Sequence, residues 1–283
     1  MIDLHSHTNE SDGTFTPLEL VDLAMDSGIE ALAISDHDTF AGFDQALPIA
    51  RARGLDLVCG IELSTRVPGS KVRTVHLLAY FLHQPPAADF REWLDELIAG
   101  RRDRNQRLIA SLREQGLDIN LSEVEKLGRT LTGRPHFARI LIDKGYVSSY
   151  EEAFRRYLGE TAPTYVERFA PYVVAAIQRV IDAGGLPVLA HPIRLGFRDS
   201  ASEEKFISEL RDGGLGGIEV FHSDHRPRDM ERYAGIARKY NLAVTGGSDF
   251  HGEAKPQISL GTGYNGNLDI PKSVLENLRA VSA

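Results

Sequence analysis

The stretch ALAISDHD at residues 31–38 joins a short apolar run to a cluster of acidic and imidazole side chains. An apolar run of this length, bounded by turn residues, predicts a buried strand. The preceding segment predicts a helix, because Thr16 is a good N-cap, Pro17 fits the first turn and Gly28 marks the end. Functional side chains therefore follow directly after a strand that a helix precedes.

The same alternation of strand and helix continues on both sides of this stretch. Further strands are predicted over the first half-dozen residues and over 55–63, 72–82, 186–190, 217–221 and 242–245. Helices are predicted between them, over 42–53, 172–183, 203–212 and 228–240. The strand at 72–82 alternates less cleanly and fits a hairpin partner. About seven strands with crossover helices indicate an α/β barrel.

The rhythm changes between residues 87 and 165, where only helical periodicity is found. Phe90, Leu94 and Leu97 form one apolar stripe, and shorter helices are predicted near 122–127, 135–144 and 150–158. So long a segment without a strand does not fit a barrel repeat of one strand and one helix. We expect a barrel domain formed by residues 1–86 and 166–283, with residues 87–165 as a small helical insertion domain.

Composition excludes several classes of protein. The net charge of −8 over 283 residues argues against a broadly basic surface that coats nucleic acid. A single cysteine, Cys59, excludes a disulfide framework within one chain and makes a thiolate zinc site improbable. No apolar stretch is long enough for a membrane span, and Met1 is followed by no signal-like leader. We therefore expect a cytoplasmic protein without an obligate protein partner.

Nine carboxylate and imidazole side chains lie in strands, at strand ends or in the loops that follow. Because the carboxyl ends of barrel strands meet at one rim, such side chains can form one polynuclear metal site. Nitrogen and oxygen donors without a thiolate suit manganese, iron(II) or zinc. The candidate ligands are His5, His7, Asp12, His37, Glu62, His76, His191, Asp249 and His251.

Taken singly, several of these residues have an ordinary structural interpretation. Asp12 lies in the turn sequence ESDG, and His76 and His191 fit hydrogen-bonded histidines of a core. Glu62 is more informative, because an unpaired carboxylate inside an apolar strand is costly to bury. Either a metal ion or an ion pair with an arginine would remove that cost.

The set as a whole resembles the polymerase and histidinol phosphatase (PHP) superfamily. The resemblance rests on DLHSHT at 3–8, SDHD at 35–38, GIE at 60–62, VH at 75–76, AHP at 190–192 and GSDFH at 247–251. It implies a distorted seven-stranded (β/α)7 barrel that usually binds three divalent metal ions. It assigns one metal to His5, His7, Glu62 and Asp249, a second to Asp12, His37 and His251, and a third to Glu62, His76 and His191, with Glu62 bridging.

One ligand departs from the pattern of the relatives. Several of them carry histidine at the position of Asp12. An anionic oxygen ligand there favours manganese over zinc.

The segments TGRPHF at 132–137 and GIEVFHSDH at 217–225 are similar to one branch of that superfamily. The similarity implies a phosphomonoesterase that releases the 3′-phosphate of 3′,5′-nucleoside bisphosphates by attack of a metal-bound hydroxide, leaving the nucleoside 5′-monophosphate. The alternatives are a 5′–3′ exoribonuclease acting on short RNA, an amidohydrolase, and a catalytically inactive barrel retained as a binding module. The expected partner of the phosphoesterase is a small anionic phosphate ester such as a nucleotide, or a short RNA.

Substrate contacts are expected from the insertion and from the rim. Arg134 and His136 flank Pro135 at a helix start, where free N–H groups and a guanidinium fork suit a phosphate. Arg194 follows His191 and is a second candidate. His222 or His225 is expected to protonate the leaving sugar oxygen. The arginine run at 101–107 is interpreted as a solvated helix face paired with nearby acids.

Overall fold

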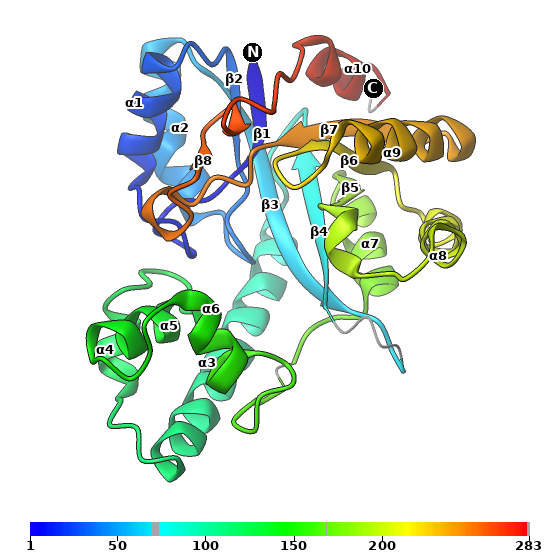
Figure 1. The fold of residues 1–283 in the computed structure, drawn as a ribbon. Coiled ribbons are helices and arrows are strands. Elements are labelled where there is room, and N and C mark those ends of the chain that lie inside the picture. The colour runs from blue at the N-terminus through cyan, green and yellow to red at the C-terminus, as the bar shows by residue number, and fades with distance from the viewer. Residues whose placement is uncertain (70–73, 168, 282–283) are drawn as a thin grey trace.

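The computed structural model describes residues 1–69, 74–167 and 169–281, and its central feature is one curved sheet of seven strands (Figure 1). The strands follow one another around the sheet in chain order. They are β1 (Ile2–Ser6), β2 (Ala31–Ile34), β3 (Asp56–Arg66), β4 (Thr74–Phe81), β5 (Leu186–Leu189), β6 (Gly217–His222) and β7 (Ala243–Gly247). Helices surround the sheet, which confirms the predicted α/β barrel of seven strands.

The first and last strands nearly close the barrel. Asp249 N donates a hydrogen bond of 2.8 Å to His5 O, and His7 N donates one of 2.9 Å to Phe250 O. Gly247 is required here, because a Cβ atom at this position would lie 2.2 Å from the Cβ of His5. The two ends of the chain's ligand series are therefore brought together by backbone contacts.

One strand runs against the others, as the hairpin interpretation anticipated. β4 is antiparallel to both β3 and β5, and its register places His76 opposite Ser64. Because β4 is reversed, a residue near its beginning lies at the rim where the parallel strands end. The first residues of the predicted strand, 72–73, lie outside the described part of the chain.

The helices that cover the sheet begin and end close to their predicted bounds. In α1, Thr16 accepts a hydrogen bond from Glu19 N and Glu19 reaches back to the cap, with Pro17 at the first position. Helix α1 spans Pro17–Asp26. The other helices around the barrel are α2 (Ala41–Arg53), α7 (Val173–Asp182), α8 (Ser200–Asp212) and α9 (Pro227–Tyr240). Short 3₁₀ turns follow β5 and β7, namely η2 (Pro192–Leu195) and η3 (Gly252–Ala254).

The C-terminal segment contains elements that the sequence patterns did not indicate. A two-stranded hairpin of β8 (Ile258–Ser259) and β9 (Gly263–Tyr264) precedes α10 (Ser273–Val281). Leu275 and Leu278 of α10 pack in one core with Ile2 and Leu4 of β1. This helix lies at the end of the sheet where β1 begins, opposite to the rim that carries the candidate ligands (Figure 1).

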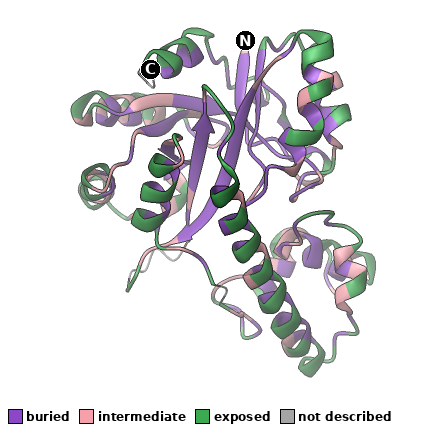
Figure 2. Cartoon of the chain, turned by 180° about the vertical axis from the view of Figure 1, so that it is seen from behind, coloured by how far each residue is buried: buried purple, intermediate pink, exposed green. Residues whose placement is uncertain are grey.

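The predicted insertion is helical and begins with a long helix, α3 (Ala88–Glu114), which leads away from the barrel (Figure 2). Its first turns pack through Phe90 and Leu97 in the core of the barrel, and its last turns pack through Leu108 and Leu112 in a second core. That second core also holds α4 (Leu121–Glu125), α5 (Arg134–Asp143), α6 (Tyr150–Ala153) and the π-helical turn η1 (Phe154–Leu158). Because α3 belongs to both cores, the division of the chain at residues 87 and 165 stays a prediction.

Among the described residues, no helix combines the length and the apolar character that crossing a membrane would need.

Candidate metal centre

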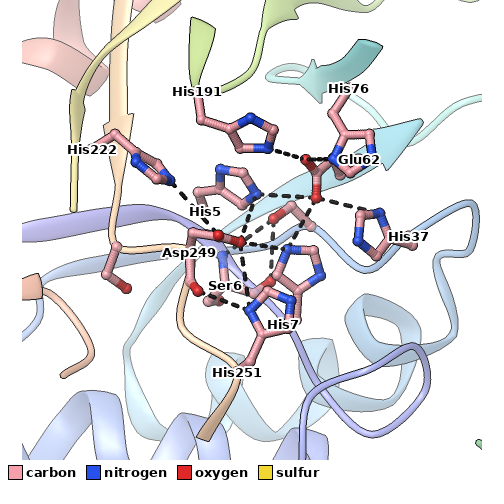
Figure 3. A network of polar contacts seen from close by, with 12 residues as sticks. His5, Ser6, His7, His37, Glu62, His76, His191, His222, Asp249 and His251 are labelled. Carbon is pink, nitrogen blue, oxygen red and sulfur yellow. Dashed lines mark hydrogen bonds and ion pairs between the residues drawn. The ribbon is translucent and has the colours of Figure 1, made fainter. Parts of the chain in front are cut away.

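The nine candidate ligands from the sequence converge on one rim of the barrel, and Figure 3 labels all of them except Asp12. Donor atoms of all of them except His191 form three overlapping groups, and within each group the atoms lie within 4.8 Å of one another. The groups are His5, His7, Glu62 and Asp249; His7, Asp12, His37 and His251; and His37, Glu62 and His76. The first group is the predicted first set, and the second is the predicted second set with His7 added. The third has His37 where the predicted third set has His191.

Glu62 is the centre of this arrangement. Its Oε1 lies 2.8 Å from His76 Nδ1 and 2.9 Å from His191 Nε2. Its Oε2 lies 3.2 Å from His5 Nε2, 3.1 Å from His7 Nε2 and 3.3 Å from His37 Nδ1. The ion pair with an arginine that sequence alone left open is not found among the described residues. A carboxylate with imidazoles on both oxygens has the arrangement of a bridging ligand.

The ring nitrogens fit metal ions better than they fit one another. Among the described residues, His5 Nε2, His7 Nε2, His37 Nδ1 and His76 Nδ1 are buried and have no hydrogen-bond partner, although carboxylate oxygens lie close. Unsatisfied buried polar atoms are costly, so their clustering calls for an explanation. Mixed imidazole and carboxylate donors without thiolate are the donor set of divalent transition metals. The residues present therefore fit divalent ions.

Charge within the centre is balanced by protons in the metal-free chain. Burial opposes a charge on His7, but the nearby carboxylates of Asp249 and Glu62 outweigh burial and raise its pKa to about 9. Burial lowers the pKa of His37 to about 3. Burial also raises the pKa of the Glu62 carboxyl, yet the neighbouring His37 and His76 hold it well below its usual range. Metal ions binding here would displace the proton from His7.

Asp12 and Asp249 provide the carboxylates on either side of Glu62. Asp12 Oδ1 lies 3.3 Å from His251 Nε2, and Asp249 Oδ1 lies 3.3 Å from His7 Nε2. Asp249 has a φ of 58° and His191 a φ of 24°. Backbone in this region is unfavourable for side chains with a Cβ, and it clusters at functional sites. Each residue lies two positions after the end of a strand, so the strained turns direct their side chains over the rim.

A buried carboxylate that we did not predict orients one ligand. Glu219 Oε1 accepts a hydrogen bond of 2.8 Å from His5 Nδ1, and its Oε2 accepts one of 2.6 Å from His191 N. With Nδ1 acting as a donor, His5 presents its unprotonated Nε2 to the centre, as metal-binding histidines do. Glu219 lies inside the apolar strand β6, so the argument that singled out Glu62 would have found it too.

A second missed carboxylate fixes the loop that carries Asp12. Asp36 accepts hydrogen bonds from Thr8 N at 2.7 Å, Thr8 Oγ1 at 2.6 Å and Ser11 Oγ at 2.6 Å. Asp12 is the next residue after Ser11. The turn interpretation of this segment is thus compatible with a ligand role, because the turn holds Asp12 toward the centre.

The two predicted proton donors have different surroundings. His222 faces the centre, with Nε2 3.7 Å from Asp249 Oδ2, and its Nδ1 accepts a hydrogen bond of 3.0 Å from Asp224 N (Figure 3). His225 donates from Nδ1 to Val220 O at 2.8 Å, and its ring lies 4.8 Å from that of Tyr233. Only His222 is close to a candidate ligand.

Cationic side chains flank the centre on one side. Arg194 contacts Asp224 and Asp249, each at 2.7 Å. Lys255, which sequence reasoning missed, also lies 2.7 Å from Asp249 Oδ2. Asp249 thus directs Oδ1 to the imidazoles of His5, His7 and His251, and Oδ2 to the two cations.

The arginine run of α3 corrects the sequence interpretation. Arg102 and Arg107 are exposed and pair with Glu125 and Asp103, as expected of a solvated face. Arg101 and Arg104 are instead buried, with 8% and 3% of their surface exposed. The expectation was wrong for these two because they continue the buried face of the helix between its two cores.

Arg134 and His136 lie at the start of α5 as predicted. Arg134 donates to Leu158 O at 3.1 Å and lies over the rings of Phe154 and Tyr165. His136 Nδ1 accepts a hydrogen bond of 3.0 Å from Gly133 N. Both side chains are therefore held by the insertion itself.

Two cavities open over the centre and share part of their walls. One of about 330 Å³ is lined by candidate ligands, including Glu62 and Asp249, together with Arg194 and Lys255. The other, of about 210 Å³, is lined by arginines of β3, α3 and α5. The side chains common to both are Asp12, His37, His76, Pro135 and Phe154. The metal centre thus continues directly into an arginine-lined cavity.

Comparison with known proteins agrees with this geometry. Residues 3–167, more than half of the chain, match the PHP domain. The chain is 32% identical to a 5′-3′ exoribonuclease of Haemophilus influenzae, covering 96% of each protein. It is also 32% identical to a 3′,5′-nucleoside bisphosphate phosphatase of Chromobacterium violaceum, covering 88% of this chain and 87% of that protein.

A solved structure from Bifidobacterium adolescentis, assigned to the metal-dependent phosphoesterases, superimposes with a TM-score of 0.84 at 31% identity, covering 98% of this chain and 95% of the other. The sequence similarity, the fold and the clustered candidate ligands all support the same family assignment. The chain belongs to the PHP domain family and is a hydrolase of phosphoester bonds.

Proposed function

We propose that this protein is a phosphomonoesterase that converts a 3′,5′-nucleoside bisphosphate to the nucleoside 5′-monophosphate by releasing the 3′-phosphate. The observation that carries the proposal is the arginine-lined cavity that adjoins the metal centre and shares Asp12, His37 and His76 with it. A substrate with one phosphate at the metals and another anionic group nearby fits both cavities. The related bisphosphate phosphatase from Chromobacterium violaceum supports the same substrate class.

The proposed centre holds three divalent ions, with manganese favoured and iron(II) or zinc as alternatives. The nine residues listed above would hold them, and Glu62 would bridge. Such ions, when bound, polarise phosphoryl oxygens, neutralise developing charge and supply a nucleophile from water at neutral pH. The oxygen donor of Asp12 is what favours manganese.

His222 is the residue that we propose to act on the leaving 3′-oxygen, by donating a hydrogen bond from its Nε2 as negative charge develops there. Because Asp224 N donates to its Nδ1, the neutral ring carries its proton on Nε2. That Nε2 has no hydrogen-bond partner among the described residues. In His225 the proton is on Nδ1, which donates to Val220 O, so its Nε2 has none to give. Of the two candidates that sequence left open, these contacts support His222.

Arg194 and Lys255 are placed to bind the phosphate that is released. Both line the cavity over the ligands and contact Asp249 Oδ2 at 2.7 Å. Their charges would also offset the negative charge that develops on the transferring phosphoryl group. Arg134 lines the second cavity, where it would contact the rest of the nucleotide, and His136 would keep the start of α5 in place.

A phosphate-release assay with defined substrates tests the proposal. The protein is stripped with a chelator, reloaded with Mn²⁺ and given adenosine 3′,5′-bisphosphate, adenosine 3′-monophosphate or a short 5′-phosphorylated RNA. We expect fastest release from the bisphosphate, with the 5′-monophosphate as product. Faster shortening of the RNA, with nucleoside 5′-monophosphates released one at a time, would replace the proposal by the exoribonuclease alternative. No turnover of any of the three would favour the binding module.

A further inference from the structure

Between its two cores, α3 carries arginines where the pattern of the helix calls for apolar residues. Its buried face runs through Leu97, Arg101, Arg104 and Leu108, at spacings of four, three and four residues. Leu97 packs in the core of the barrel and Leu108 in that of the insertion. Two cations thus occupy the stretch of this face that lies over the cavity. Burying a guanidinium is costly unless an anion compensates it.

We propose that Arg101 and Arg104 form the binding site for the phosphate of the substrate that is not hydrolysed, with Arg66 at its rim. The inference rests on the proposed function and makes it specific, because it assigns this phosphate to the side chains of α3. Sequence reasoning had assigned it to Arg134 and His136 at the start of α5.

The charges around the cavity favour an anion. Four arginines line it, namely Arg66, Arg101, Arg104 and Arg134. The carboxylates in its wall are Asp12, which belongs to the proposed metal centre, and Glu167, which lies 3.3 Å from Arg66. A second phosphate would therefore meet four guanidinium groups and two carboxylates in this wall, although Arg101 also pairs with Asp38.

Contacts within the wall hold Arg101 in position without using all of its nitrogen atoms. Arg101 pairs with Asp38 and donates to Ser64 Oγ at 3.3 Å, and both of these contacts use its Nη2. Its buried Nε has no hydrogen-bond partner among the described residues. Burial lowers the pKa of Arg134, and the nearby charge of Arg101 adds to the lowering. Two guanidinium groups that repel each other across a cavity are a favourable setting for a phosphate between them.

Arg134 is better suited to forming the wall than to binding the phosphate alone. It donates to Leu158 O and lies over the rings of Phe154 and Tyr165, so part of its hydrogen-bonding capacity is used inside the insertion. The arginines of α3, by contrast, are placed by a helix that also packs on the barrel. A phosphate bound by α3 is thus held at a fixed position relative to the metals.

The test compares Arg104→Met with Arg102→Met in the full-length, Mn²⁺-loaded enzyme. Arg102 is the matched control, because it lies on the same helix but is exposed and pairs with Glu125. We expect Arg104→Met to lower kcat/KM for adenosine 3′,5′-bisphosphate by about 10-fold to 100-fold, the usual effect of losing a hydrogen bond to a charged group. Its kcat/KM for adenosine 3′-monophosphate, which lacks the second phosphate, should stay unchanged. Arg102→Met should alter neither value.

A binding measurement separates this inference from the proposed function. Adenosine 5′-monophosphate is titrated calorimetrically into the chelator-treated protein, where no turnover occurs. Arg104→Met should weaken its binding about 10-fold or more, and Arg104→Lys less than that, because the charge is kept. This result would stand even if the enzyme prefers another phosphate ester.

Three results would overturn the assignment. They are equal losses on the bisphosphate and the 3′-monophosphate, equal effects of the two methionine variants, and unchanged binding of adenosine 5′-monophosphate. Circular dichroism checks that each variant is folded. If Arg104→Met is not, Arg104→Lys is compared with Arg102→Lys by the same three criteria, since the lysine retains the buried charge.

Discussion

Replacing Glu62 by glutamine is the perturbation that bears most directly on the proposed centre. The substitution keeps the shape of a side chain that is only 1% exposed, but it removes the charge and gives one of its two ends an NH₂ group. That group would face ring nitrogens that now lie within 2.8–3.3 Å of the carboxylate oxygens. Glu62 belongs to the first and third proposed ligand sets and not to the second. We therefore expect two of three ions to be lost and the ion at Asp12, His37 and His251 to remain.

The size of the effect follows from the linkage of binding and folding. An ion present at about 100 times its dissociation constant stabilises the fold by about 2.7 kcal/mol. Two lost sites would thus remove about 5 kcal/mol of the stabilisation that Mn²⁺ gives to the wild type. Activity should fall by about 10³-fold or more, because loss of several kcal/mol of charge stabilisation at the phosphoryl group corresponds to that factor.

The assay combines metal analysis of the dialysed protein with thermal unfolding in the presence and absence of Mn²⁺. Glu96→Gln, on the exposed side of α3, is the control for removing one acid. A Glu62→Gln protein that retains three ions, or that gains as much thermal stability from Mn²⁺ as the wild type, would refute the bridging role. A variant that loses all ions would show that the three sets do not form independently.

Three further predictions concern residues around the centre. Glu219→Gln should weaken Mn²⁺ binding about 10-fold to 100-fold in a metal titration, because it disturbs the hydrogen bond that orients His5, and unchanged affinity would exclude this role. Gly247→Ala should destabilise the metal-free fold by about 1–3 kcal/mol in denaturant unfolding, since the added methyl group meets the backbone and Cβ of His5, and a neutral effect would contradict the close approach. Burial raises the pKa of the Cys59 thiol to about 12, so the reactive thiolate stays scarce between pH 7 and 9. A thiol reagent should therefore label the protein only on unfolding, and rapid labelling of the folded protein at pH 8 would contradict this prediction.

Periodic patterns of apolar residues were sufficient to predict the barrel and the strand ends that form its rim. The strand that ends before His37 and the one that contains Glu62 were visible because their apolar runs are short and bounded by turns. Strand ends in a barrel share one rim, so residues far apart in sequence could be expected in one place. His76 was the harder case, since only the reversal of β4 brings it to that rim.

The residues that sequence reasoning missed are those whose role depends on packing between distant segments. Arg101 and Arg104 look like part of a solvated run until α3 is known to lie between two cores. Glu219 acts through its contact with His5, which lies far away in the chain. Lys255 acts through its contact with Asp249, which lies across a turn. The C-terminal helix α10 was not predicted, because its apolar stripe is short and its packing against the start of β1 is visible only in the folded structure.

Anomalous diffraction from crystals grown with Mn²⁺ is the most direct test of the central claim that nine side chains form one trinuclear centre. The account predicts three anomalous peaks at the barrel rim, two of them in contact with Glu62 and the third with Asp12, His37 and His251. Peaks that avoid Glu62, or a protein that binds no Mn²⁺ at this rim, would contradict it.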